Sequence, residues 1–337
     1  MLSLSKRKNP SNGSELDLAH SGASSRKQSW FAQLGKYIRE NSILFILGAP
    51  ALILIFLLSY IPMFGTVIAF QDYSPRTMFL SPWVGFRNFR VLLETPLFIR
   101  LVTNTLLLNS MFIGVTTFFS ITTALLLNEV RVTFFKRIAQ SVMFLPFFMG
   151  WTIVAMVLYG VIDYEVGTIN GLLTRIGMDR IILTDNAVIW PWILTIIRVW
   201  KGTGSGCIIY LAALTSIDQQ LYEAASIDGA SRFQRMRYIS IPSIMPVMIM
   251  LVLLEVGKIF YGDIAMLYAI VGDRAQLFPT TDVIDTYILR ALRSNSNYGF
   301  SAAAGLLQAV LGFICVFGSN WLAKKYSQMR GEDYALF

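Results

Sequence analysis

Four charged side chains stand inside long apolar stretches of the sequence. Arg198 and Lys201 share one stretch, and Glu255 and Lys258 share another. Charge at membrane depth is costly and usually faces a cavity or a partner, so these residues are candidates for lining a pathway. Two simpler interpretations stay open. Glu255 and Lys258 could pair on one helix, and Lys201 could extend to the membrane surface.

Two aromatic residues, Trp200 and Tyr261, lie beside these charges. The face of an aromatic ring is apolar and could stack on a sugar ring, so both are further pathway candidates. Packing between helices is the alternative at each position.

Several kinds of chemistry are excluded. The single histidine, His20, lies in a polar stretch, and the two cysteines, Cys207 and Cys315, lie in apolar ones. These residues support no catalytic site, zinc site or disulfide framework. The sequence also has no GxxxxGK[ST] phosphate loop. We therefore expect no catalytic residue, no metal and no cofactor on this chain.

The composition indicates an integral membrane protein. Hydrophobic residues make up 55% of the 337 residues, charged residues only 14%, and the mean hydropathy is +0.58. A soluble domain carries about 25% charge. The net charge of +8 is then explained by basic loops on the cytoplasmic side of a membrane rather than by nucleic acid.

Six apolar stretches are each long enough to cross a bilayer, which takes about 20 helical residues. The fold class is therefore an all-α membrane protein with six transmembrane helices in a domain at 41–325. Residues 1–40 are predicted to be a partly disordered tail, compatible with a short interfacial helix at its end, and 326–337 a second tail. The predicted spans are Ile43–Met63, Val102–Leu127, Ile138–Ile162, Ala187–Leu214, Ser243–Ile270 and Ser301–Ala323.

The orientation follows from the distribution of basic residues. With the N-terminus in the cytoplasm, the outside loops contain no Lys, and the short inside loop Asn128–Arg137 is strongly basic. Short loops obey the positive-inside rule best. We therefore expect both termini to be cytoplasmic.

A polar stretch, residues 218–242, separates the fourth and fifth predicted spans and is cytoplasmic in this orientation. Asp218 is predicted to cap a helix over Gln219–Ile227. Gly229 permits a sharp turn, and a second short helix is predicted over Ser231–Tyr238. From these features alone, an ordinary helical loop facing lipid headgroups explains the stretch as well as a rigid helix-turn-helix that contacts a partner.

The spacing of residues in this stretch decides between the two. Glu223-Ala224-Ala225, three residues, Gly229, nine residues and Ile239-x-Ile241-Pro242 resembles the EAA loop of ABC importer permeases, with Ile241 where that pattern has Leu. The segment Trp200-Lys201-Gly202-Thr203-Gly204 is similar to oligosaccharide permeases of the maltose type. Tyr60–Met63, Phe70–Tyr73 and Trp83–Phe89 look like the polysaccharide permease branch, which includes importers of alginate and pectin fragments.

The resemblance implies a type I ABC importer transmembrane domain in a bacterial plasma (inner) membrane. It implies a second permease subunit, a dimeric ATPase that binds ATP and Mg²⁺, and an extracytoplasmic solute-binding protein. The EAA helix would fit a groove in the ATPase, with Glu223 making a polar contact there. The residues assigned to this coupling are Glu223, Ala224, Ala225, Asp228, Gly229 and Arg232.

The substrate implied is an oligosaccharide. Arg and Lys side chains in a channel of low dielectric would neutralise sugar carboxylates, so we expect an acidic, uronate-type oligosaccharide. A membrane-embedded enzyme and a passive channel remain alternatives. The first needs a polar catalytic constellation at membrane depth, which does not stand out here. The second needs no ATPase partner.

Overall fold

The computed structural model describes residues 37–295 and 297–330. The regular elements of these residues are helical, as predicted, apart from one isolated antiparallel bridge between Gln71 and Trp83. Most of the predicted N-terminal tail (1–36) and the end of the C-terminal tail (331–337) lie outside the described residues.

The chain divides into two units at Gly65. The first contains α3 (Ser42–Ile55), the π-helical turn η1 (Phe56–Tyr60) and the start of the 3-10 helix η2 (Ile61–Phe70). No side chain of α3 or η1 is buried. Their apolar surface therefore suits a lipid environment or another helix.

The second unit holds the remaining elements. In chain order they are η3 (Met78–Leu80), α4 (Arg87–Glu94), α5 (Pro96–Glu129), α6 (Thr133–Phe144), η4 (Leu145–Phe148), α7 (Trp151–Ile162), α8 (Thr168–Arg175), α9 (Trp190–Thr215), α10 (Gln219–Ile227), α11 (Arg232–Arg235), the π-helical η5 (Met236–Ser240), α12 (Ile241–Val256), α13 (Ile264–Ile270), η6 (Ala275–Leu277), α14 (Phe278–Thr281), α15 (Ile284–Asn295) and α16 (Tyr298–Arg330).

Four helices among the described residues are long and apolar enough to cross a membrane. They cover Ser42–Phe70, Pro96–Glu129, Arg232–Val256 and Tyr298–Lys325, and they overlap the first, second, fifth and sixth predicted spans. The fourth predicted span is α9, which has 26 residues. Because Arg198, Lys201 and a Gly-Thr-Gly-Ser run lower its hydropathy, α9 is not among the four.

Two predicted spans are interrupted in the structure. The third is broken, because α6–η4 and α7 meet at a bend of 101°. Pro146 lies within η4, just before the bend. The fifth ends early, because α12 stops at Val256 and α13 begins only at Ile264. Both interruptions adjoin the cavity described below.

Close approach of α9 to its neighbours depends on two glycines. A Cβ on Gly206 would lie 2.5 Å from the Ser120 hydroxyl oxygen on α5, and one on Gly204 would lie 2.1 Å from the Met143 carbonyl oxygen on α6. Small residues of this kind let membrane helices pack tightly. Any larger side chain at either position would force the helices apart.

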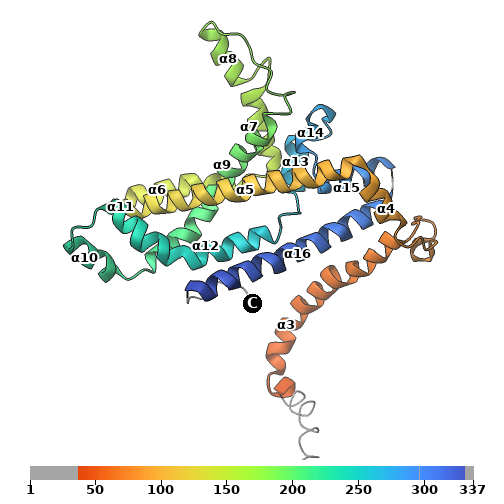
Figure 1. Cartoon of the computed structure of the whole chain (residues 1–337), viewed down its shortest axis with the longest axis horizontal. Helices are drawn as coiled ribbons and strands as arrows, with labels where there is room; N and C mark the ends of the chain where they lie inside the picture. The colour runs from red at the N-terminus through yellow and green to blue at the C-terminus, as the bar shows by residue number, and fades with distance from the viewer. Residues whose placement is uncertain (1–36, 296, 331–337) are drawn as a thin grey trace, which may run out of the picture. The chain divides into compact units, whose positions relative to one another are not determined.

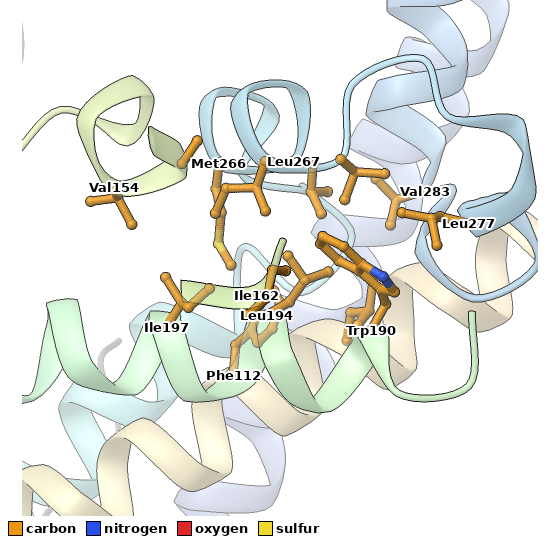
Figure 2. Close-up of a cluster of buried hydrophobic side chains, with 14 residues drawn as sticks. Phe112, Val154, Ile162, Trp190, Leu194, Ile197, Met266, Leu267, Leu277 and Val283 are labelled. Carbon is orange, nitrogen blue, oxygen red and sulfur yellow. The ribbon is translucent and has the colours of Figure 1, made fainter. Parts of the chain in front are cut away.

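The largest buried cluster joins α5, α7, α9 and α13 (Figure 2). Trp190 at the start of α9 is fully buried and its indole N–H donates to the carbonyls of Leu183 and Thr184. Within the second unit, Figure 1 shows α10 and α11 near one end of α5 and α15 near the other. The cavity lies between these two regions.

Candidate functional site

A cavity of about 750 Å³ opens between α5, η4, the start of α7, α9, the end of α12 and the segment that follows α12. Five of the six predicted pathway residues line it: Arg198, Lys201, Glu255, Lys258 and Tyr261. Trp200 does not line it, although its side chain is exposed. The structure thus brings together residues that are far apart in the sequence.

Arg198 is already paired. Its guanidinium donates to the Asp263 carboxylate at 2.6 Å, with both side chains partly buried. The other oxygen of Asp263 caps α13 by accepting from the Met266 N–H at 3.0 Å. The pair therefore fixes the start of α13 against α9.

Lys201 directs its ammonium group at the bend between η4 and α7. It donates to the carbonyls of Pro146, Phe147 and Met149 at 3.1, 2.7 and 2.7 Å. The ammonium group also lies 5.2 Å from the centre of the Trp151 ring. These carbonyls lie at the end of η4, where the Pro146 carbonyl also accepts from the Met149 N–H at 3.1 Å, so Lys201 adds a cap at that end. The three N–H donors of Lys201 are used in these bonds, which favours the cap over an extension to the membrane surface.

Glu255 and Lys258 are exposed to the cavity. The alternative in which their side chains pair is not observed, since the described residues show no ion pair between them. Their link is a backbone bond of 2.9 Å from the Lys258 N–H to the Glu255 carbonyl. The helix ends at Val256, so the two side chains no longer share a helix face.

Sequence reasoning missed four polar residues that support this cavity. Asn109 on α5, Gln308 on α16, Asp285 on α15 and Asp263 all bond to the segment Gly257–Asp263 or lie within it. Asn109, Asp263 and Gln308 each stand in an apolar stretch of the sequence. A polar residue in such a stretch is the signal that could have identified them. Among the described residues, no group of three His, Cys, Asp or Glu side chains could hold a metal ion.

The stretch 218–242 forms two short helices joined by a tight turn. Asp218 accepts from the Gln220 N–H at 2.9 Å, which confirms the predicted cap of α10. Gly229 has φ +79°, and the N–H groups of Gly229 and Ala230 bond to the carbonyls of Ser226 and Ala225. This is a Schellman ending, which requires the left-handed conformation that favours glycine.

The second helix is shorter than predicted and continues differently. α11 begins with a capping box between Ser231 and Gln234. Beyond Arg235 the chain widens into η5 before α12. The turn is braced by two side-chain bonds, from Arg235 to the Ser226 hydroxyl at 2.7 Å and between Tyr222 and Ser240 at 2.9 Å. The predicted helix-turn-helix is therefore present and internally fixed.

The residues predicted to couple are mostly on its surface. Glu223, Ala224, Asp228, Gly229 and Arg232 are exposed, and Ala225 is half-buried. Arg232 lies 4.0 Å from the Glu129 carboxylate at the end of α5. Apolar side chains accompany them: Ile227 is 87% exposed and Phe233 is 64% exposed. An exposed apolar and charged face on a rigid turn is suited to contact another protein.

Comparisons with known proteins agree with this architecture. Residues 116–328 match the family described as binding-protein-dependent transport system inner membrane component. Protein LplB of Bacillus subtilis is 36% identical over 89% of this chain and 93% of its own length. The polygalacturonan/rhamnogalacturonan transport system permease protein YteP of the same organism is 36% identical over 86% of this chain and 90% of its own.

Two solved structures are also similar. A bacterial ABC transporter involved in the import of the acidic polysaccharide alginate superimposes with a TM-score of 0.80 and 30% identity, covering 87% of this chain and 99% of the other. A bacterial alginate ABC transporter in complex with an alginate pentasaccharide-bound periplasmic protein gives 0.79 and 29%, covering 88% and 98%.

Proposed function

Because the chain belongs to the family of binding-protein-dependent transport system inner membrane components, we propose that it forms half of the translocation pathway of a bacterial ABC importer for an oligosaccharide. The chain is a multi-pass permease of the sugar-transporter type. The observation that carries the proposal is the cavity, which is lined by charged and aromatic side chains and bordered by two interrupted helices.

ATP hydrolysis belongs to a partner in this proposal. The EAA helix α10 docks in a groove of an ATPase subunit, with Glu223 and Arg232 as polar contacts and Ala224 and Ala225 against its wall. ATP and Mg²⁺ bind the ATPase. The Schellman turn at Gly229 and the bonds to Ser226 and Ser240 support this role, because a braced turn can transmit a push without bending.

The remaining partners follow from the same assignment. A second permease subunit supplies the other half of the pathway, and an extracytoplasmic solute-binding protein delivers the sugar. The similar transporter with its pentasaccharide-bound periplasmic protein supports this arrangement. The chain crosses the inner membrane six times in this scheme, with α9 and the bent pair as spans and both termini in the cytoplasm.

The proposed substrate is an acidic oligosaccharide. The names of the polygalacturonan/rhamnogalacturonan permease and the alginate transporter support a uronate polymer. Within the cavity, Arg198 is paired with Asp263 and Lys201 is bonded to three carbonyls. Among the described cations that line the cavity, Lys258 is the one that remains for a carboxylate, and Tyr261 lines the same cavity and could stack on a sugar ring.

Reconstituted complexes test this proposal. With the ATPase, the second permease and the binding protein present, uronate oligosaccharides should stimulate ATP hydrolysis more than neutral oligosaccharides of equal length. Lys258→Gln should lower uronate uptake about tenfold, as expected for one lost charge-assisted bond, and Lys258→Arg should retain most of it. Equal stimulation by neutral sugars would overturn the acidic preference.

An enzyme or a passive channel would behave differently. Either would be fully active without an ATPase and would not retain one through purification in mild detergent. Stable co-purification of the chain with an ATPase, lost in Glu223→Lys, therefore separates the importer from both alternatives.

A further inference from the structure

The segment Gly257–Asp263 is an unwound stretch between α12 and α13 that lines the cavity. In a continuous helix the carbonyls of Ile259, Phe260 and Tyr261 would accept bonds from N–H groups four residues later. Asn109 instead donates to the carbonyls of Ile259 and Tyr261 at 2.7 and 3.2 Å. Non-helical backbone at membrane depth is tolerated where such partners satisfy it.

The middle of the segment depends on two buried side chains. Gln308 is 2% exposed and Asp285 is 9% exposed. The Gln308 amide nitrogen donates to the Phe260 carbonyl at 2.5 Å and to the Asp285 carboxylate at 2.8 Å. The same carboxylate oxygen accepts from the Gly262 N–H at 2.5 Å. One connected network thus satisfies a carbonyl and an N–H that the missing helix leaves free.

This network reaches from the cavity to α15. A Cβ on Gly262 would lie 2.9 Å from a Val283 methyl group and 3.2 Å from the Asp285 carboxylate, so the segment is in close contact with the start of α15. That start is fixed to α5, since Asn104 donates to the Asp282 carbonyl and the Ile284 N–H donates to Thr105. Movement of α15 would therefore move the cavity wall.

We propose that Asp285 and Gln308 are positioning residues for transport. They hold Gly257–Asp263 unwound, keep Lys258 and Tyr261 at the cavity wall, and connect that wall to α15. The inference rests on the proposed function. Neither residue touches the sugar. Loss of the network leaves the Phe260 carbonyl and the Gly262 N–H without partners, which favours rewinding of the segment and rotation of Lys258 away from the cavity.

The test is the amount of sugar imported per ATP hydrolysed in proteoliposomes that contain equal amounts of assembled complex. Gln308→Met keeps the side-chain length but donates no bonds, and Asp285→Leu accepts none. Both should lower the ratio about tenfold, the effect of losing one well-formed buried bond. Asp285→Asn keeps an acceptor oxygen and should stay within about twofold of wild type. Gln276→Leu, which breaks an exposed bond to Asp185, is the matched control and should have no effect.

The outcomes distinguish failure of the proposed function from failure of the positioning role. If the wild-type complex shows no sugar import driven by ATP, the proposed function fails. If it does, and Gln308→Met and Asp285→Leu import as much sugar per ATP as wild type, the positioning role is wrong. Failure of both variants to assemble, or an equal loss in Asp285→Asn and Asp285→Leu, would also overturn it. The first would make the residues purely structural, and the second would show that the carboxylate charge matters rather than the acceptor.

Discussion

Replacement of Lys201 by methionine removes the group that caps the bend between η4 and α7. The ammonium group bonds to three carbonyls, at 3.1, 2.7 and 2.7 Å. Hydrogen bonds to charged groups contribute about 1.5–3 kcal/mol each, so the three bonds of Lys201 would contribute about 5–9 kcal/mol if nothing replaced them. Water can replace the bond at the exposed Phe147, and the variant no longer desolvates a charge. We therefore expect the free energy of unfolding to fall by about 2–4 kcal/mol.

Two measurements check this expectation. Unfolding in mixed micelles titrated with SDS gives the loss of free energy. Spin labels at the exposed positions Val142 on α6 and Met156 on α7 report the bend, and their distance distribution should broaden in Lys201→Met. Lys258→Met is the matched control, because Lys258 lines the same cavity and the described residues show no carbonyl bonded to its ammonium group. It should change the free energy of unfolding by no more than about 0.5 kcal/mol, the usual range for surface substitutions.

One result would refute this reasoning about Lys201. If Lys201→Met leaves both the unfolding free energy and the label distances unchanged while sugar uptake is lost, then Lys201 contacts the sugar and does not cap the bend. The original expectation that it binds the substrate would then hold.

Three further predictions concern other contacts. Gly229→Ala places a Cβ at φ +79°, which costs about 1–2 kcal/mol, and should lower the fraction of ATPase that co-purifies. Burial raises the pKa of Asp285 above 3.8. The protonated carboxyl therefore stabilises the folded protein fully below about pH 4, and this stabilisation is lost as pH rises through the raised pKa. Asp285→Asn should remove this pH dependence from the thermal midpoint. A double-mutant cycle of Arg198→Gln with Asp263→Asn should give a coupling of about 1–3 kcal/mol by SDS titration, whereas additive losses would show that the 2.6 Å pair contributes no stability.

The coupling segment could be predicted from the sequence because its structure is local. The cap at Asp218, the left-handed Gly229 and the two flanking helices each depend on residues within one or two turns. The fixed spacing from Glu223 to Pro242 adds the resemblance that predicts an ATPase partner. The π-helical continuation at Met236–Ser240 has no such local signal, since the same residues suit an α-helix equally well.

The interruption after α12 could not be predicted in this way. Apolar runs such as Ser243–Ile270 satisfy the length and hydropathy of a continuous span. The helix ends at Val256 because side chains of α5 and α16 donate to the carbonyls that follow. These donors, Asn109 and Gln308, lie about 150 and 50 positions from their carbonyl partners in the sequence. Hydropathy does not contain that information.

The two interruptions also change how intramembrane polar residues should be interpreted. Backbone groups freed at a break in lipid must find partners, and nearby cations and amides are taken for that purpose. Lys201 serves the break after η4, and Asn109 and Gln308 serve the break after α12. A count of charges at membrane depth therefore overestimates the groups that remain for a solute. In the importer that we propose, Lys258 and Glu255 are the charged cavity residues that remain for substrate choice once these caps and the Arg198–Asp263 pair are subtracted, and their opposite charges would favour a carboxylate held at a defined distance from a hydroxyl donor.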